Sequence, residues 1–262
     1  MKISLLVLVL PSAVAQFEQF GGQKNCPEFK CRRKDETPVP KFPLKLISTG
    51  CSSIGGGGMA MMGGRDTIGE AAISPCCDLY HSCTQICGST KSFCDSNFEV
   101  CMENKCNSLQ NVSAKKECET AISTKKIMLQ ISQCTEFDTA QKDNCECVKK
   151  DEVSAKRSAV VSGFYKKFNP SAVEKAGALA AKATDSKKLA GLLFKLVEKY
   201  PKAIKKVKDP KQKMMEDMMS DGKFKLNGGG SIKRDVDSEE NIKVDDSEEF
   251  IEVDDSEERI EL

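Results

Sequence analysis

Apolar residues recur at helical spacing in three separate stretches of the chain. Between residues 76 and 106 the repeating positions are mostly cysteines, with offsets of four and seven residues. Between residues 118 and 134 they are mainly aliphatic, and between residues 189 and 200 they are mainly leucines separated by lysines. Because residues three or four apart share one face of a helix, this pattern predicts a mainly helical protein.

The cysteine-rich stretch predicts a pair of helices. Cys76 and Cys83 lie seven residues apart, as do Cys94 and Cys101, so each pair of thiols shares one helix face. Gly88 interrupts the pattern and is placed to end the first helix, because glycine adopts the left-handed C-cap conformation without strain. We expect two antiparallel helices joined by disulfides.

Shorter signals predict the elements around this pair. A third helix is expected between Cys118 and Cys134, and Cys145 and Cys147 predict an extended segment with both thiols on one side. Three prolines between residues 38 and 43 exclude helix from that region. A second helix-forming stretch is expected at residues 172–183.

A basic amphipathic helix is predicted after these elements, with Asp185 or Ser186 as its N-cap and Pro201 as its end. Its apolar positions recur at three-to-four spacing: Leu189, Leu192, Leu193, Leu196, Val197 and Tyr200. Lysines take the other positions: Lys187, Lys188, Lys195 and Lys199. The apolar stripe either packs against a neighbouring helix or lies on an anionic lipid surface with the lysines at the headgroups.

The overall charge is balanced, with 40 basic and 39 acidic residues, but the two signs are segregated. Residues 235–262 contain fourteen acidic against two basic residues in three copies of a repeat that begins with Val-Asp. A block of like charge repels itself and cannot bury a core, so this tail is predicted to be disordered.

All fourteen cysteines lie between Cys26 and Cys147, which indicates an oxidising compartment. Residues 1–15 have the basic start, apolar run and Ala-Val-Ala end of a secretory signal peptide, and this run is shorter than the about 20 residues of a membrane span. We therefore expect a secreted, extracellular protein, with the lumen of the endoplasmic reticulum as the alternative. The Asn111-Val112-Ser113 sequon makes Asn111 a candidate glycosylation site. A single histidine and the lack of paired C-x2-C knuckles disfavour a zinc module.

The spacing C-C-x5-C-x3-C-x6-C-x6-C-x4-C between residues 76 and 106 resembles the helix pair of secreted phospholipase A2, most closely its group XII branch. In that family the first helix carries C-C-x-x-H-D-x-C and the second opens with Cys-Asp, which Cys94-Asp95 matches. The first motif reads C-C-D-L-Y-H-S-C here. Tyr80 therefore stands at the position of the family's histidine base, and His81 at that of its calcium-binding aspartate. The resemblance covers residues 45–148.

The resemblance implies a mainly α, disulfide-rich phospholipase A2-like fold with two long antiparallel helices. The residue patterns described above add a basic helical extension and the disordered acidic tail after this fold. Cys26 and Cys31 either close a small loop or bridge to the core. The other twelve cysteines are the expected disulfide formers: Cys51, Cys76, Cys77, Cys83, Cys87, Cys94, Cys101, Cys106, Cys118, Cys134, Cys145 and Cys147. The expected divisions are a signal peptide (1–15), an N-terminal segment (16–48), the cysteine-rich domain (49–150), the basic extension (151–226), and a glycine hinge with the acidic tail (227–262).

The implied reaction is hydrolysis of the sn-2 ester of a glycerophospholipid by a His–Asp dyad with calcium. Tyr80, which titrates near ~10, and Asp95 would take the catalytic positions, and a phenol is a poor base. Calcium ligands would come from His81 and from Gly50 and Ser52 of a glycine-rich stretch (49–64), which is either a calcium loop or a flexible connector. An imidazole is a poor ligand for this hard cation, so calcium is disfavoured as a cofactor.

Three functional hypotheses follow. The leading one is a secreted phospholipase A2-like protein with a substituted site that binds phospholipid or acyl chains. The second is a calcium-dependent phospholipase A2 of lipid catabolism. The third is a cysteine-rich interaction module that uses the basic helices or the acidic tail to bind a protein partner. The expected partners are accordingly phospholipid or a membrane surface, or a protein, and not a nucleic acid.

Overall fold

The computed structural model describes residues 26–54, 68–132, 134–208 and 214 of the chain. The expected signal peptide, most of the glycine-rich stretch and the acidic tail lie outside the described residues. All the elements discussed below belong to one compact unit, residues 1–213. Their order is β1 (Glu36–Pro40), β2 (Leu46–Ser48), a 3₁₀ helix (Gly50–Ser53), α1 (Ile68–Gln85), α2 (Lys91–Asn107), α3 (Val112–Ile131), α4 (Cys134–Asn144), β3 (Cys145–Lys149), α5 (Val153–Phe168), a 3₁₀ helix (Pro170–Lys175), α6 (Ala176–Lys182), α7 (Ser186–Lys199), a 3₁₀ helix (Pro201–Ala203) and β4 (Ile204–Lys206).

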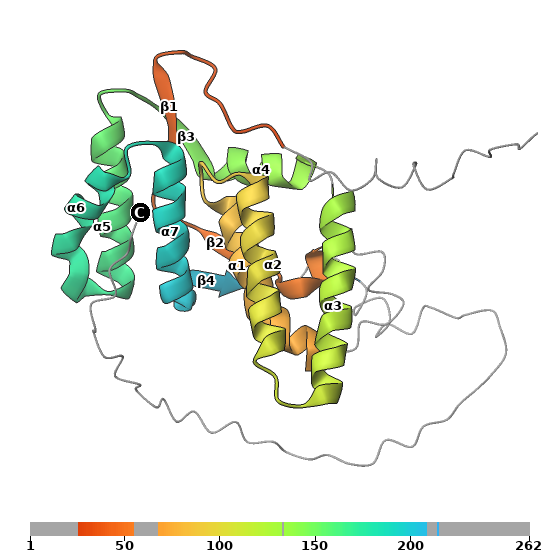
Figure 1. Ribbon diagram of the computed structural model, residues 1–262. Helices are drawn as coiled ribbons and strands as arrows, with labels where there is room; N and C mark the ends of the chain where they lie inside the picture. Colours follow the sequence, from red (N-terminus) through yellow and green to blue (C-terminus); the bar gives the residue numbers. More distant parts are fainter. Residues whose placement is uncertain (1–25, 55–67, 133, 209–213, 215–262) are drawn as a thin grey trace, which may run out of the picture. The chain divides into compact units, whose positions relative to one another are not determined.

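Helices α1 and α2 form the predicted antiparallel pair at the centre of this unit (Figure 1). Helix α3 lies on one side of the pair, and α7 with α5 and α6 lies on the other. One buried apolar cluster fills the space among α1, α2 and α3, and includes Ile73, Phe98 and Met102. A second joins α1 to α5, α6 and α7. The expected mainly helical, disulfide-rich fold is confirmed, with both cores resting on the same helix pair.

The turn between α1 and α2 depends on Gly88, as predicted. Its φ of +91° lies in the left-handed region that favours glycine. A Cβ at this position would also overlap the backbone of Ser186 at the start of α7. Thr90 then caps α2, because its side-chain oxygen accepts a hydrogen bond from the Phe93 N–H at 3.2 Å.

Seven disulfides join the fourteen cysteines, and no free cysteine remains. The N-terminal cysteines bridge to the core rather than to each other, which resolves the two alternatives left open by the sequence. The pairs are Cys26–Cys134, Cys31–Cys147, Cys51–Cys77, Cys76–Cys101, Cys83–Cys94, Cys87–Cys145 and Cys106–Cys118.

The predicted third helix is wrong in its bounds. It begins at Val112, so that Cys118 lies inside α3, while Cys134 opens a separate helix, α4. The early start follows from Asn111, whose side-chain oxygen accepts from the N–H groups of Ser113 and Ala114 at 2.8 and 3.1 Å. This cap stabilises the first turn without any apolar periodicity.

Two short sheets pair segments that lie far apart in the sequence. Strand β1 pairs antiparallel with β3, and β2 pairs parallel with β4. The prolines of β1 are compatible with this because, within the described part of the chain, the strand pairs on one side only. The pairing of β2 with β4 brings residues 46–48 beside residues 204–206.

The apolar stripe of α7 is buried, with Leu192, Leu193 and Val197 inaccessible to solvent. The packing interpretation is therefore confirmed, and a helix lying with its leucines in lipid is wrong. Asp185 is the N-cap of α7 and accepts from the Lys188 N–H at 2.8 Å. The stretch 172–183, predicted as one helix, is split between the 3₁₀ helix Pro170–Lys175 and the short helix α6.

None of the helices in the described part of the chain is both long enough and apolar enough to cross a membrane.

Candidate functional site

Tyr80 lies between the two disulfides that join α1 to α2. It follows Cys76 by four residues and precedes Cys83 by three, so all three side chains share the helix face turned toward α2. Cys76 is bonded to Cys101 and Cys83 to Cys94, which fixes how the two helices are aligned. The Tyr80 ring consequently packs on Phe98 of α2, with 4.9 Å between ring centroids.

The phenol of Tyr80 donates a hydrogen bond to Oδ1 of Asp95 at 3.1 Å. The second carboxylate oxygen, Oδ2, accepts from Nζ of Lys91 at 2.5 Å, and both side chains of this ion pair are buried. The structure therefore brings together the two expected catalytic positions and adds a buried cation that the sequence analysis missed. The signal was present, because Lys91 and Asp95 stand four residues apart on the predicted α2.

Burial of Tyr80 raises the pKa of its phenol far above the ordinary value of about 10, and the negative charge of Asp95 and the hydrogen bond to it raise this pKa further. The phenol is therefore neutral and acts as a donor toward Asp95. A group in this state cannot take a proton from water at physiological pH.

His81 contacts the turn that follows β2. Its Nε2 lies 2.9 Å from the backbone oxygen of Gly50, at the start of the 3₁₀ helix Gly50–Ser53. A carbonyl oxygen can only accept, so Nε2 carries a proton and donates. The φ of +71° at Gly50 belongs to the left-handed region and forms part of this turn.

The next carbonyl of the same turn is also bound by a side chain. Nζ of Lys125, from α3, donates to the oxygen of Cys51 at 2.7 Å and forms an ion pair with Glu70 at 3.2 Å. The carbonyl of Gly50, an expected calcium ligand, and that of the adjacent Cys51 thus accept hydrogen bonds from side chains of the protein itself. The side chain of Ser52, the other expected loop ligand, lies outside the described side chains.

Asp78, the carboxylate nearest to His81 along α1, is buried and bound to residues of other elements. Its Oδ1 accepts from the Ser48 hydroxyl at 2.6 Å, and its Oδ2 pairs with Nζ of Lys206 at 2.8 Å. Asp78 therefore ties the strands β2 and β4 to α1. With both oxygens bound in this way, Asp78 does not supply the carboxylate that is missing at residue 81, three positions later.

Comparison with protein families matches residues 8–154 to group XII secretory phospholipase A2 precursor. This chain belongs to that family. Among individual relatives, mouse group XIIA secretory phospholipase A2 is 29% identical over an alignment of 115 residues that covers 41% of this chain and 55% of the mouse protein. The human group XIIA protein is 24% identical over 51% of this chain and 69% of its own length. Mouse group XIIB secretory phospholipase A2-like protein is 26% identical over 52% of this chain and 71% of its own. The chain thus matches little more than half of the first of these relatives, and no solved structure gives a significant match.

The described residues of this group XII member do not fit a calcium ion. Calcium takes six to eight oxygen ligands, usually with carboxylates among them. Here the Gly50 and Cys51 oxygens already accept hydrogen bonds from His81 and Lys125, and the carboxylate of Asp78 is held by Ser48 and Lys206. Asp66, the other carboxylate near the expected loop, lies outside the described residues.

Two small cavities flank Tyr80 in this phospholipase A2-like domain. One, of about 160 Å³, is lined by Tyr80, His81 and Lys91 together with residues of α3 and α4. The other, of about 220 Å³, lies between α1, α2 and α7 and is lined by Leu79, Tyr80, Phe98, Val100 and Phe194. Both are smaller than the roughly 300–1,000 Å³ of pockets that enclose a whole drug-sized ligand.

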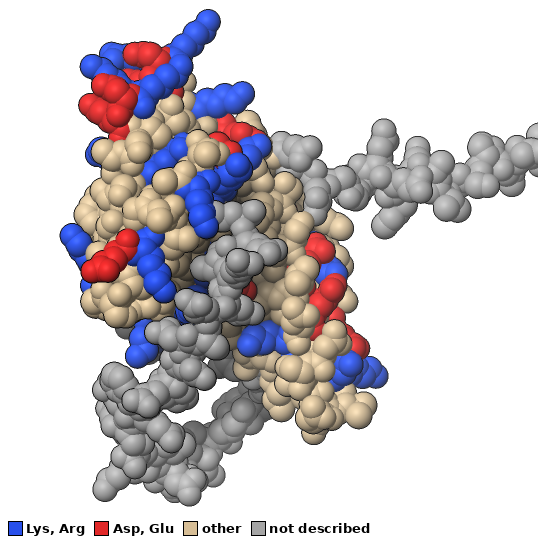
Figure 2. Space-filling model, turned by 60° about the vertical axis from the view of Figure 1, so that its left-hand side comes forward, with Lys and Arg blue, Asp and Glu red and all other residues tan. Residues whose placement is uncertain are grey.

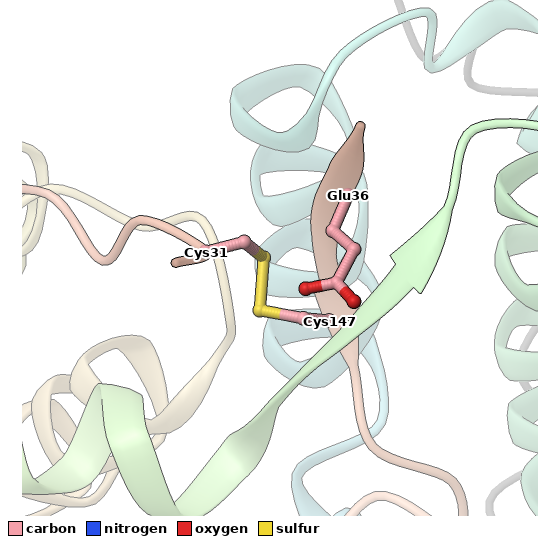
Figure 3. Close-up of side chains that lie close together, drawn as sticks. All are labelled: Cys31, Glu36 and Cys147. Atoms are coloured by element: carbon pink, nitrogen blue, oxygen red, sulfur yellow. A yellow bond between two sulfur atoms is a disulfide. The ribbon is translucent and has the colours of Figure 1, made fainter. Parts of the chain in front are cut away.

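Two cysteines and a glutamate elsewhere in the domain lie close enough together to suggest a metal site. The ligand atoms of Cys31, Glu36 and Cys147 lie within 4.8 Å of one another (Figure 3). However, Cys31 and Cys147 form a disulfide, which leaves no thiolate to bind a metal.

Asn111, the predicted glycosylation site, is exposed at the N-cap of α3.

Proposed function

We propose that this protein binds phospholipid through its acyl chain and does not hydrolyse it by His–Asp–calcium chemistry. The observation that carries the proposal is the double use of Asp95. One oxygen accepts from the Tyr80 phenol and the other from the Lys91 ammonium. This carboxylate therefore orients a proton donor, not a general base.

The electrophilic half of the family's reaction is altered independently. Hydrolysis of an ester needs a positive group or hydrogen-bond donors aimed at the oxygen that becomes negative. In this chain the side chains of His81 and Lys125 donate hydrogen bonds to the carbonyl oxygens of Gly50 and Cys51. The two changes act on different steps, so reversing one of them is not sufficient for activity.

The site for an acyl chain is the cavity of about 220 Å³ between α1, α2 and α7. Its lining is mainly apolar, with Leu79, Phe98 and Phe194 around the cavity and the exposed Val100 at its edge. An apolar chain placed there leaves water, which is favourable in proportion to the area buried. The size of the cavity suits part of an acyl chain and not a whole phospholipid.

The test is lipid extraction from the purified, oxidised full-length protein, followed by titration with a soluble short-chain phosphatidylcholine. We expect bound lipid in the wild type and its loss in Val100→Trp, which fills the edge of the cavity. Val112→Trp, at an exposed position on α3, is the matched control and should keep the lipid.

A parallel assay follows fatty acid release from phospholipid vesicles with calcium and with a chelator. We expect no calcium-dependent release. Release that disappears in Asp95→Ala would overturn the proposal in favour of an enzyme. Absence of both bound lipid and titratable binding would overturn it in favour of an interaction module that does not bind lipid.

A further inference from the structure

An aromatic side chain is held at the surface beside α5. Phe42, in the loop that joins β1 to β2, is 53% exposed. The inner edge of its ring lies directly on Gly163 of α5, where a Cβ would overlap the ring. The loop is anchored by Lys41, whose Nζ donates to the carbonyl of Asp143 at 2.6 Å. Phe42 is thus exposed and at the same time fixed in position.

Three exposed lysines belong to the same two segments as this ring and the glycine that supports it. Lys166 and Lys167 follow Gly163 by three and four residues, so they lie on the same face of α5 as the glycine that supports Phe42. Both are exposed, as is Lys45 at the end of the Phe42 loop. The Phe42 patch is defined here as Phe42, Lys45, Lys166 and Lys167.

The patch belongs to the basic part of the molecule. Residues 153–208 contain fourteen Lys or Arg against three Asp or Glu, whereas residues 68–144 contain seven against ten. Figure 2, in which the side of the molecule that carries α5 and α6 comes forward, shows Lys and Arg side chains spread over that face. Because the charge is concentrated on this side, an anionic surface is attracted to it in a defined orientation.

We infer that the Phe42 patch docks this protein on the surface of an anionic phospholipid membrane. The inference rests on the proposed function for its lipid partner, but it concerns a different group of residues from the acyl-chain cavity. An apolar ring inserts among the headgroups, and lysines around it bind phosphate and carboxylate groups at the same level. Lysine suits this partner because its ammonium is a mobile point charge that needs no fixed bidentate geometry.

The experiment measures binding of the full-length protein to vesicles of phosphatidylcholine, with and without phosphatidylserine, at low and high salt. Phe42→Ala removes the ring, and its control Ile127→Ala removes a side chain of similar exposure, 57%, from α3. Lys166→Glu/Lys167→Glu reverses the flanking charge, and its control is the adjacent pair Lys115→Glu/Lys116→Glu of α3. Thermal unfolding of each variant shows whether it is folded.

We expect wild-type binding that requires phosphatidylserine and weakens with salt. Phe42→Ala should weaken it by roughly tenfold, for a ring only partly inserted, and the α5 double variant by at least about thirtyfold. Both controls should bind as the wild type does.

Two results would overturn the inference. Equal binding by the wild type and both patch variants would place the membrane contact elsewhere, while the proposed acyl-chain cavity would stand. No wild-type binding to either vesicle would exclude membrane docking. The proposed function would then be decided separately by the soluble short-chain lipid, which does not need a membrane surface.

Discussion

The ammonium group of Lys91 and the carboxylate of Asp95 form a buried ion pair one helical turn apart on α2, with 2.5 Å between Nζ and Oδ2. Their side chains are 3% and 5% exposed. In this position the Lys91 ammonium neutralises the Asp95 carboxylate, whose negative charge would otherwise stabilise a protonated base at residue 80. The other oxygen of Asp95 accepts from the Tyr80 phenol and thereby joins α2 to α1.

Removal of Lys91 should be strongly destabilising. Lys91→Met leaves the Asp95 carboxylate buried with only the Tyr80 phenol as a partner, and breaking such a pair costs about 3–5 kcal/mol. The double variant Lys91→Met/Asp95→Asn removes both charges and should recover more than half of that loss. Denaturant unfolding with intact disulfides measures both values. A single variant as stable as the wild type would contradict the assigned ion pair.

Alkaline pH should destabilise the protein through Tyr80. Its pKa is raised in the folded state by burial and by Asp95, whereas in the unfolded chain it stays at about 10. Above that pH the unfolded state has lost a proton that the folded state retains, so the stability present at lower pH declines as the pH rises.

Tyr80→Phe provides the comparison for this pH dependence. At neutral pH it should be less stable than the wild type by about 1 kcal/mol, because Asp95 loses a hydrogen bond. Above a pH of about 10 the difference should shrink, since phenylalanine does not ionise. Unfolding free energies that decline in parallel for the two proteins over this range would contradict the role of Tyr80.

Calcium titrated into the purified wild type should give no heat of binding. In Tyr80→His/His81→Asp a carboxylate replaces the imidazole and releases the Gly50 carbonyl, so weak calcium binding should appear, with a dissociation constant of about 10⁻⁴–10⁻³ M. Calorimetry measures both. Tight binding by the wild type would reveal ligands outside the described residues and favour the enzyme.

Substitution of Asp78 on α1 and of Lys206 on β4, which form an ion pair, should lower the free energy of unfolding by unequal amounts. Asp78 is 6% and Lys206 71% exposed. Lys206→Ala should lower the unfolding free energy by less than about 1 kcal/mol, because exposed pairs contribute little. Asp78→Ala should lower it by about 1–3 kcal/mol, because it also leaves the buried Ser48 hydroxyl without its acceptor. Equal losses would contradict this assignment.

Much of the helical framework could be predicted from local patterns. The apolar periodicity of α7 and its Asp185 N-cap both lie within one helix and its first turn. Gly88 likewise marks the turn after α1. Helix α5 was missed although Val160, Val161, Phe164 and Tyr165 are buried at helical spacing. The start of α3 was misplaced because Asn111 carries the signal and the apolar pattern does not.

The sequence by itself determined the helix pair, the oxidation of the cysteines and the residue, Tyr80, that stands at the position of the expected base. These are local properties, since helical periodicity, cysteine spacing and a motif position depend on neighbouring residues. Only the tertiary structure decided that His81 and Lys125 bind the Gly50 and Cys51 carbonyls, and that Phe42 rests on Gly163. These contacts join residues from 31 to 121 positions apart, and their formation depends on how packed helices and disulfides bring distant backbone together, which no local pattern encodes.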